Sequence, residues 1–335
     1  MKLTCSVRAA LVVLSIVAPA IGGPVTASAA QFTNLIGNQN RNIPTEFHGG
    51  VGSSGLASGG RYALLSGPHA ARLDLNSGVS DSIGSVPSTL EPIAAEGAIS
   101  SDGRWVAFAT WQNGIDPGDV NDYPDVYLKD FATGTISLVS RSMLGLTGGG
   151  TGPSISGDGS VVAFVGIWDG LVPFDQKGAH DTYAYDQATG ILEMVNVDVT
   201  GLPPSYTGCW PLCALSEDSP FRTAVSFDGR YVAFSSAADN LTLDTGPSFH
   251  GNVYVRDRSL RVTELISKSM QGGRANSISG SAAISSDGRY VAFLSYATDL
   301  VVAPGFPPAP PSDSQIYIRD RVTGVTSLIS ATPVG

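Results

Sequence analysis

One segment in the first half of the chain carries oxygen ligands at a spacing typical of cation-binding loops. It reads Asp116-Pro-Gly-Asp119-Val-Asn121-Asp122-Tyr-Pro-Asp125. Counted from Asp119, oxygen-bearing side chains stand at positions one, three and seven, as at the start of a calcium loop. Position six is Pro124 instead of glycine, and the glutamate typical of position twelve is missing. Asp119, Asn121 and Asp125 are therefore a calcium candidate, with turn capping by Asp and Asn as the alternative.

A second polar segment, Asp175-Gln-Lys-Gly-Ala-His180-Asp181, contains groups that could transfer protons. Because His and Asp commonly act as general acids and bases, His180 and Asp181 are the best candidates for an enzyme acting on polysaccharide, as a lyase or a hydrolase. The sequence has no Gly-x-Ser-x-Gly elbow, no His pair at i, i+4 and no phosphate-binding glycine loop. We therefore expect a non-catalytic protein without a cofactor other than calcium, and the enzyme is the alternative.

Large aromatic residues accumulate near these segments. Rings beside carboxylates and amides suit the binding of a glycan or a peptide, because the ring supplies apolar area and the polar groups fix orientation. Trp111 and Trp168 could instead cover the edge of a hydrophobic core. The candidate ligand-binding residues are Trp111, Trp168, Trp210, Tyr206, Asp116, Asp119, Asp175, His180 and Asp181.

The overall charge limits the class of partner. The chain has 19 Lys and Arg against 29 Asp and Glu, a formal net charge of -10. Such a surface repels phosphate backbones, so we expect no nucleic acid partner. We expect a monomer that binds a protein or a glycan.

Five copies of a short motif must position these residues. The clearest copy is Ala283-Ile-Ser-Ser-Asp-Gly-Arg-Tyr-Val-Ala-Phe-Leu-Ser295, and the others begin at Gly55, Ala98, Ser154 and Ala224. Each copy has two strand-like runs around Asp-Gly, or Gly-Gly in the first copy. These pairs tolerate φ > 0, so each motif predicts a tight β-hairpin.

A second strand pattern follows each hairpin, as in Asn252-Val-Tyr-Val-Arg-Asp257. It alternates with period two, and its closing Asp is expected to accept hydrogen bonds from the amides of the next turn. A fourth strand follows that turn. Four antiparallel strands repeated without helical periodicity predict an all-β fold, a β-propeller with five four-stranded blades, or six as the alternative. The expected blades are 55–83, 98–140, 154–196, 223–267 and 282–330, within one domain at 55–335.

The two patterns together, Ser-x-Asp-Gly-Arg-Tyr-Val-Ala-Phe and Val-Tyr-Val-Arg-Asp, resemble the WD40-like (PD40) repeat of TolB-type propellers, in the variant found in secreted bacterial proteins. The resemblance covers nearly all of the chain after residue 55 and implies the propeller fold. It does not select a function, because this repeat occurs in binding subunits and in accessory domains of enzymes.

The propeller topology predicts where the insertions lie. Connections between the second and third strands, and between blades, leave a propeller on one face, while the Asp-Gly and Thr-Gly turns leave it on the other. All long connections of this chain are of the first kind. Because loops on a rigid scaffold usually carry binding sites, we expect the ligand on the long-loop face.

The N-terminus predicts export to the periplasm or the extracellular medium. Residues 1–29 have the features of a Sec signal peptide, with Lys2 and Arg8 before an apolar run and Ala27-Ser-Ala29 as the cleavage site. The apolar run is too short for a membrane span. In the segment 30–54, Phe32–Ile36 resembles the last strand and is expected to close the ring, or else belongs to a disordered leader.

Two cysteines remain after removal of the signal peptide. Cys209 and Cys213 flank Trp210-Pro-Leu in the longest connection between blades. In an oxidising compartment such a pair is expected to form a disulfide. Metal binding is the weaker alternative, because no further Cys or His lies close by in the sequence to complete a zinc site.

Overall fold

The structure is a computed structural model that describes residues 56–57, 59–67, 69–86, 93, 96–119, 121–142, 145, 148–166, 170–173, 175, 180–205, 223–247, 251–301 and 314–330. Every regular element in these ranges is a β-strand. A helix long and apolar enough to cross a membrane is not found in them.

The strands form five antiparallel sheets, each built from strands consecutive in the chain. Blade 1 contains β1 (Tyr62–Leu65), β2 (Ala71–Asp74) and β3 (Ser80–Ser82). Blade 2 contains β4 (Glu96–Ile99), β5 (Trp105–Thr110), β6 (Asp125–Asp130) and β7 (Ile136–Leu138). Blade 3 contains β8 (Gly150–Ile155), β9 (Val161–Gly166), β10 (Asp181–Asp186) and β11 (Ile191–Met194). Blade 4 contains β12 (Ala224–Val225), β13 (Tyr231–Ser236), β14 (Asn252–Asp257) and β15 (Val262–Leu265). Blade 5 contains β16 (Ser279–Ile284), β17 (Tyr290–Ser295), β18 (Gln315–Asp320) and β19 (Val325–Leu328).

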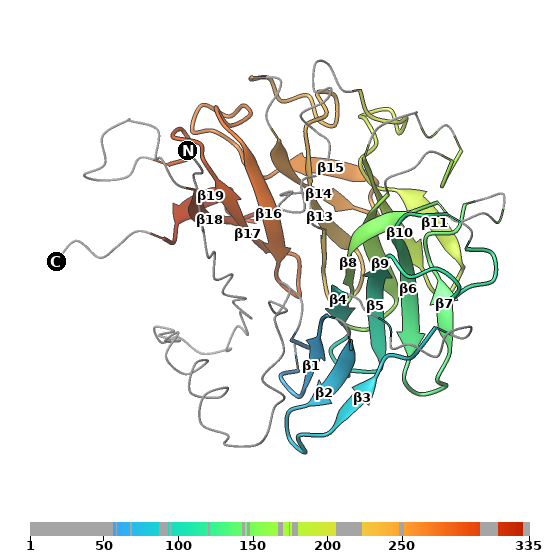
Figure 1. Cartoon of the computed structure of the whole chain (residues 1–335). Coiled ribbons are helices and arrows are strands. Elements are labelled where there is room, and N and C mark those ends of the chain that lie inside the picture. Colours follow the sequence, from blue (N-terminus) through green and yellow to red (C-terminus); the bar gives the residue numbers. More distant parts are fainter. Residues whose placement is uncertain are drawn as a thin grey trace, which may run out of the picture.

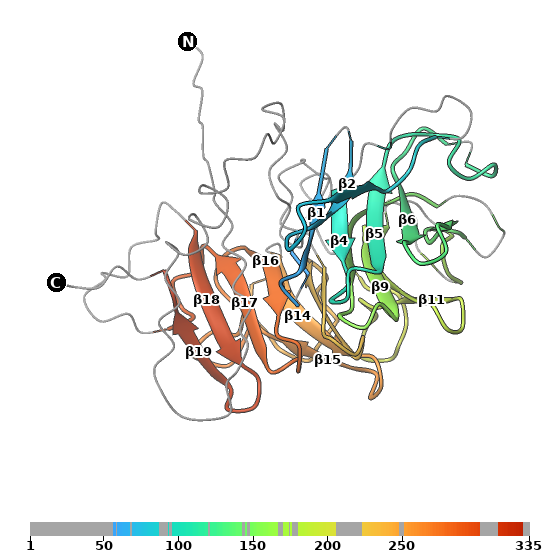
Figure 2. The ribbon, with the colours of Figure 1, turned by 90° about the horizontal axis from the view of Figure 1, so that it is seen from below.

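The prediction of an all-β, five-bladed propeller is confirmed. Sheets that follow one another in the chain are also neighbours in space, so blades 1 to 5 succeed one another around an arc (Figure 1, and turned by 90° in Figure 2). The described part of blade 1 has three strands, and the residues before Leu56 lie outside the described residues. In place of its first strand stands a single bridge between Leu56 and Ala63.

The repeated Val-Ala-Phe of the second strands builds the interfaces between blades. Successive side chains of a strand point to opposite faces of its sheet. In β5, Val106 and Phe108 therefore join a buried cluster with blade 1, while Ala107 and Ala109 join one with blade 3. The strands β9 and β13 divide their residues in the same way. The large Val and Phe side chains thus face the preceding blade, while the small Ala side chains face the next blade and allow it to approach closely.

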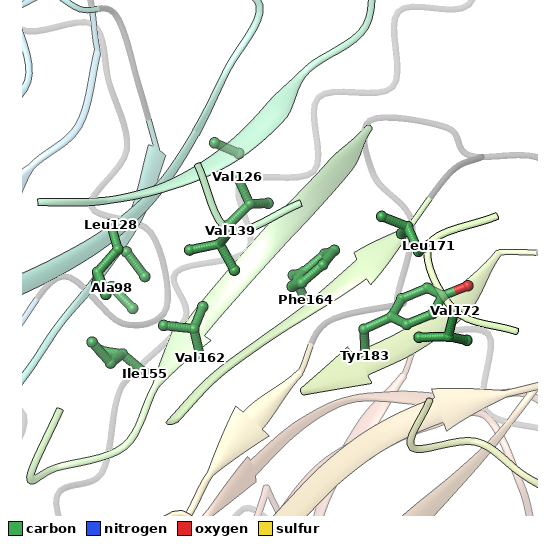
Figure 3. Packing of buried hydrophobic residues seen from close by; sticks show 12 residues of the cluster. Ala98, Val126, Leu128, Val139, Ile155, Val162, Phe164, Leu171, Val172 and Tyr183 are labelled. Atoms are coloured by element: carbon green, nitrogen blue, oxygen red, sulfur yellow. The ribbon is translucent and has the colours of Figure 1, made fainter. Parts of the chain in front are cut away.

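Four such clusters join blades 1 and 2, 2 and 3, 3 and 4, and 4 and 5. Figure 3 shows the second of them, where Val126 and Leu128 of β6 pack with Val162 and Phe164 of β9. None of these four clusters of described residues joins blade 5 to blade 1. The predicted ring-closing segment, Phe32–Ile36, lies outside the described residues.

A stacked pair of rings links the second and third strands of each full blade. Phe108 of β5 and Tyr127 of β6 are register partners, and their ring centroids are 5.6 Å apart. The other three pairs have centroid distances of 5.7 or 5.8 Å; they are Phe164 with Tyr183, Phe234 with Tyr254 and Phe293 with Tyr317. These stacks explain why both patterns place an aromatic residue at a fixed position.

The Asp that closes each third strand accepts hydrogen bonds from the next turn, as predicted. Asp130 accepts one from the backbone N–H of Ala132 at 2.8 Å. It also accepts two bonds from the guanidinium of Arg104, both 2.9 Å, which the sequence did not predict. The Arg of the Asp-Gly-Arg motif therefore fixes the second strand to the end of the third.

Candidate functional site

On the long-loop face, ion pairs join connections between second and third strands to connections between blades. Arg141, which follows β7, pairs with Asp116, which follows β5, at 2.6 Å. In blade 4 two further pairs join the same kinds of segment: Lys268 with Asp244 at 2.8 Å and Arg274 with Asp239 at 3.3 Å. Each pair thus joins a connection between the second and third strands to a connection between blades.

Trp111 is the most exposed aromatic residue described on this face. It directly follows β5, and 70% of its surface is accessible. Tyr296 has the equivalent position after β17 and is 46% exposed, and Tyr123, just before β6, is 39% exposed. The alternative that Trp111 covers the core is wrong. Trp168, Tyr206 and Trp210 lie outside the described residues, and so do Cys209 and Cys213.

Two of the predicted ligand-binding carboxylates hold their own loops. Asp116 accepts a hydrogen bond from the N–H of Gly118 at 2.8 Å in addition to its pair with Arg141. Asp175 accepts bonds from the N–H groups of Gly170 and Leu171 and from the hydroxyl of Tyr183. Both carboxylates are therefore already used for loop structure.

The calcium candidate places two carboxylates in a buried position. Asp119 is 7% exposed; its Oδ2 accepts a bond from the Tyr127 hydroxyl at 2.8 Å, and its Oδ1 has no hydrogen-bond partner among the described residues. Asp125 is fully buried and accepts bonds from Ser140, Gly149 N–H and the Asn121 amide. Asp125 and Tyr127 are two apart on β6 and so share a face of the strand. The two carboxylates thus lie on the same side of the sheet.

The surroundings of Asp125 disfavour its ionised form. Burial, and then the charge of Asp119, raise the pKa of Asp125 above its usual range, although hydrogen bonds from Ser140 and Asn121 act in the opposite direction. Buried carboxylates need a positive partner or a proton. No group of three or more His, Cys, Asp or Glu suited to a metal occurs in the described ranges, so any cation here would also need backbone or water oxygens.

Asp181, one of the two acid and base candidates, belongs to a hydrogen-bonding arrangement repeated in four blades. Asp181 is the first residue of β10; its Oδ1 accepts a bond from Asn196 Nδ2 at 2.7 Å, and Asn196 Oδ1 accepts one from Thr182 N–H at 2.8 Å. The same arrangement pairs Asp125 with Ser140, Asn252 with Ser267 and Gln315 with Ser330. Since neutral Asn252 and Gln315 serve equally well, the arrangement needs only an acceptor oxygen.

Sequence reasoning missed the partners in this arrangement. The signal was present, because a Ser or Asn follows each of Leu-Val, Met-Val, Leu-Ile and Leu-Ile at the end of blades 2 to 5. The neighbouring His180 is partly exposed, its Nδ1 has no hydrogen-bond partner among the described residues, and burial lowers its pKa. A neutral imidazole at this place could accept a proton.

Comparisons with known proteins were made for the whole chain. No family model matches it, and no curated protein matches it. Solved structures with a similar arrangement include TolB from Acinetobacter baumannii, at 17% identity over 81% of this chain and 52% of that one, with a TM-score of 0.46. A provisionally named TolB from Agrobacterium tumefaciens is 18% identical over 82% of this chain and 78% of that one, with a TM-score of 0.48.

Dipeptidyl peptidase 4 from Porphyromonas gingivalis is 14% identical over 92% of this chain and 42% of that one, with a TM-score of 0.47. The chain thus spans about half of the A. baumannii TolB and less than half of the peptidase. At these levels of similarity the assignment to the β-propeller fold rests on the strand order and register of the chain itself.

Proposed function

We propose that this protein is an exported, non-catalytic β-propeller that binds a protein or a glycan through its long-loop face. The observation that supports it is the 70% exposure of Trp111 beside loops fixed by ion pairs. An exposed Trp on a preorganised surface offers a large apolar contact area at a low entropic cost. Export rests on the signal-peptide pattern of residues 1–29.

The alternative is an enzyme that cleaves polysaccharide with His180 and Asp181. Among the described residues the Nδ1 of His180 has no hydrogen-bond partner, and burial lowers the pKa of this histidine; both favour the alternative, because a neutral imidazole is a general base. The hydrogen bond between Asp181 and Asn196 speaks against it, since the same bond occurs in blade 4 with a neutral Asn252.

Calcium bound at Asp119, Asn121 and Asp125 is also a proposal. The buried Oδ1 of Asp119, which has no hydrogen-bond partner within the described ranges, supports it. A cation there would stabilise the connection that directly follows Trp111 and thus the proposed binding surface.

The experiment exposes the immobilised protein to soluble polysaccharides, cell-wall fragments and envelope proteins, and assays the eluate for cleavage products. Trp111→Ala should weaken retention of the bound class roughly thirty-fold without a change in Tm, as for an interface hot spot. Val322→Ala is the matched control, because Val322 is 75% exposed but lies in a turn on the opposite face.

Fragments that accumulate with time and disappear in His180→Ala would support the enzyme instead. Equal retention by the wild type and Trp111→Ala would contradict the proposed surface.

A further inference from the structure

The turn between the third and fourth strands has one unusual residue in blade 4. The same turn position has φ of 72°, 79°, 68° and 69° in Gly78, Gly134, Gly190 and Gly324, and 57° in Arg261. A left-handed conformation is unfavourable for a residue with a Cβ atom. Four blades avoid this cost with Gly, so the turn itself does not need an arginine. Residues held in such backbone conformations often occur at functional sites.

Arg261 borders two adjacent hollows at the junction of blades 3 and 4. The hollows have volumes of about 410 Å³ and about 190 Å³ and share Glu193, Arg258 and Arg261 in their walls. Arg261 is exposed, and among the described residues it makes no hydrogen bond or ion pair. No contact of the Arg261 side chain with another described residue therefore explains why this residue occupies a left-handed position.

The smaller hollow combines positive charge with apolar surface. Its walls hold three arginines and one acid, Glu193, in a chain whose net charge is -10. Glu193 already pairs with Arg258 at 2.5 Å. The remaining wall residues are Met194, Val195, Val197 and Gly201.

Arg256 and Arg261 both line the smaller hollow. Arg256 is partly buried and donates a hydrogen bond to the Thr263 hydroxyl at 3.1 Å. Burial lowers its pKa, and the charge of Arg261 acts in the same direction, although Glu193 partly opposes it. Two like charges at a partly buried site favour an anion between them.

Blade 5 offers a natural comparison without the extra arginine. Arg319 donates to Thr326 at 3.0 Å, and Arg321 pairs with Glu264 of blade 4 at 2.9 Å, as Arg256 and Arg258 do in blade 4. A Cβ on Gly324 would come within 3.8 Å of the Arg319 guanidinium. A Cβ atom at this turn position therefore lies close to the partly buried arginine of the third strand, and blade 4 has the side chain of Arg261 there.

We propose that the smaller hollow binds a carboxylate attached to a short apolar chain. The carboxylate lies between Arg256 and Arg261, which donate to it through their planar guanidinium groups. The apolar chain lies along the apolar part of the hollow's wall, toward Val197 and Gly201. Arg261 lies in a short turn, whereas Val197 and Gly201 belong to the connection between blades 3 and 4, so the hollow extends from the short turns toward that connection.

The test uses the mature full chain at low salt, with hexanoate as the probe and with hexanamide and acetate for comparison. Ligand-observed NMR titration should show hexanoate binding at least about tenfold more tightly than hexanamide, which lacks the charge, and more tightly than acetate, which lacks the chain. Arg261→Gly should weaken hexanoate binding about tenfold or more, while Tm stays equal or rises because Gly tolerates the turn.

Arg261→Asn is the second variant, because Asn also tolerates φ > 0 and removes the charge without the added freedom of Gly. It should lose hexanoate binding as Arg261→Gly does. Unchanged binding in both variants, equal binding of hexanamide, or a marked fall in Tm in both variants would overturn the proposal. The last result would show that Arg261 has a structural role.

Discussion

The ring of Tyr231 in blade 4 lies against Gly288 in the Asp-Gly turn of blade 5, where a Cβ atom would overlap it. Gly288 also has φ of 72°. The same contact recurs at three other junctions, between Gly103 and Tyr62, Gly159 and Trp105, and Gly229 and Val161. The glycine of the motif therefore serves both the turn and the packing of the next blade.

Replacing Gly288 by Ala should lower the free energy of unfolding by about 3 kcal/mol, since strain in the left-handed region adds to overpacking. Chemical denaturation measures this loss. Gly134→Ala is the matched control, because Gly134 has φ of 79° but no atom within 4 Å of its expected Cβ. It should cost only about 1 kcal/mol. Equal losses in the two variants would show that the contact with Tyr231 is unimportant.

Acid should weaken the Arg104–Asp130 pair. Hydrogen bonds from Arg104 hold the pKa of Asp130 far below its usual range. The folded state therefore favours the ionised form of Asp130. The resulting contribution to folding stability is fully present above the unfolded pKa of about 4 and is lost as the pH falls through the lowered folded pKa. Asp130→Asn should therefore reduce Tm more at pH 7 than at low pH.

Thermal unfolding between about pH 2 and pH 7, a range that reaches below the unfolded pKa, measures the difference between wild type and Asp130→Asn. The exposed Asp122 supplies the control variant, Asp122→Asn, which should show no such dependence. A difference in Tm that stays constant over the whole range would contradict the assigned role of the ion pair.

Calcium should stabilise the wild type if the pair of Asp119 and Asp125 binds it. With a Kd of about 10⁻⁴ M and about 1 mM calcium, the stability gain relative to EDTA is about 1.4 kcal/mol. Asp119→Asn should abolish this gain and leave stability in EDTA unchanged or higher, because one buried charge is removed. Asp175→Asn is the control and should keep the calcium response. No calcium-dependent rise in the stability of the wild type would contradict the proposed calcium site.

Deletion of residues 31–40 should lower Tm if Phe32–Ile36 closes the ring. The far face of blade 5 supports this expectation, since Ala292 is only partly buried where its equivalents Ala107 and Ala163 have no exposed surface. Ile316 on the same sheet is 38% exposed. Deletion of residues 331–335 controls for shortening of the chain. An unchanged Tm would identify the segment as a leader.

The fold was predictable because each strand type repeats, so that the hairpins, the alternation and the turns all indicated one unit. Individual side-chain roles were less predictable. Asp116 and Asp125 look like free ligands in the sequence, but their partners Arg141 and Ser140 lie beyond the next strand and meet them only in the folded blade. The exposure of Trp111 also depended on where its loop turns, which composition does not determine.

The four buried clusters make blades 2, 3 and 4 units with two neighbours each, whereas blades 1 and 5 have one each among the described interfaces. If these four are the interfaces that hold the array together, an outer blade separates at a smaller free-energy cost than an inner one, because one interface breaks instead of two. Amide hydrogens of β1 and β18 should then exchange with solvent through partial opening, while those of β9 exchange only when the whole array unfolds. Blades of nearly the same sequence should thus differ in local stability, because they differ in the number of buried clusters that they join.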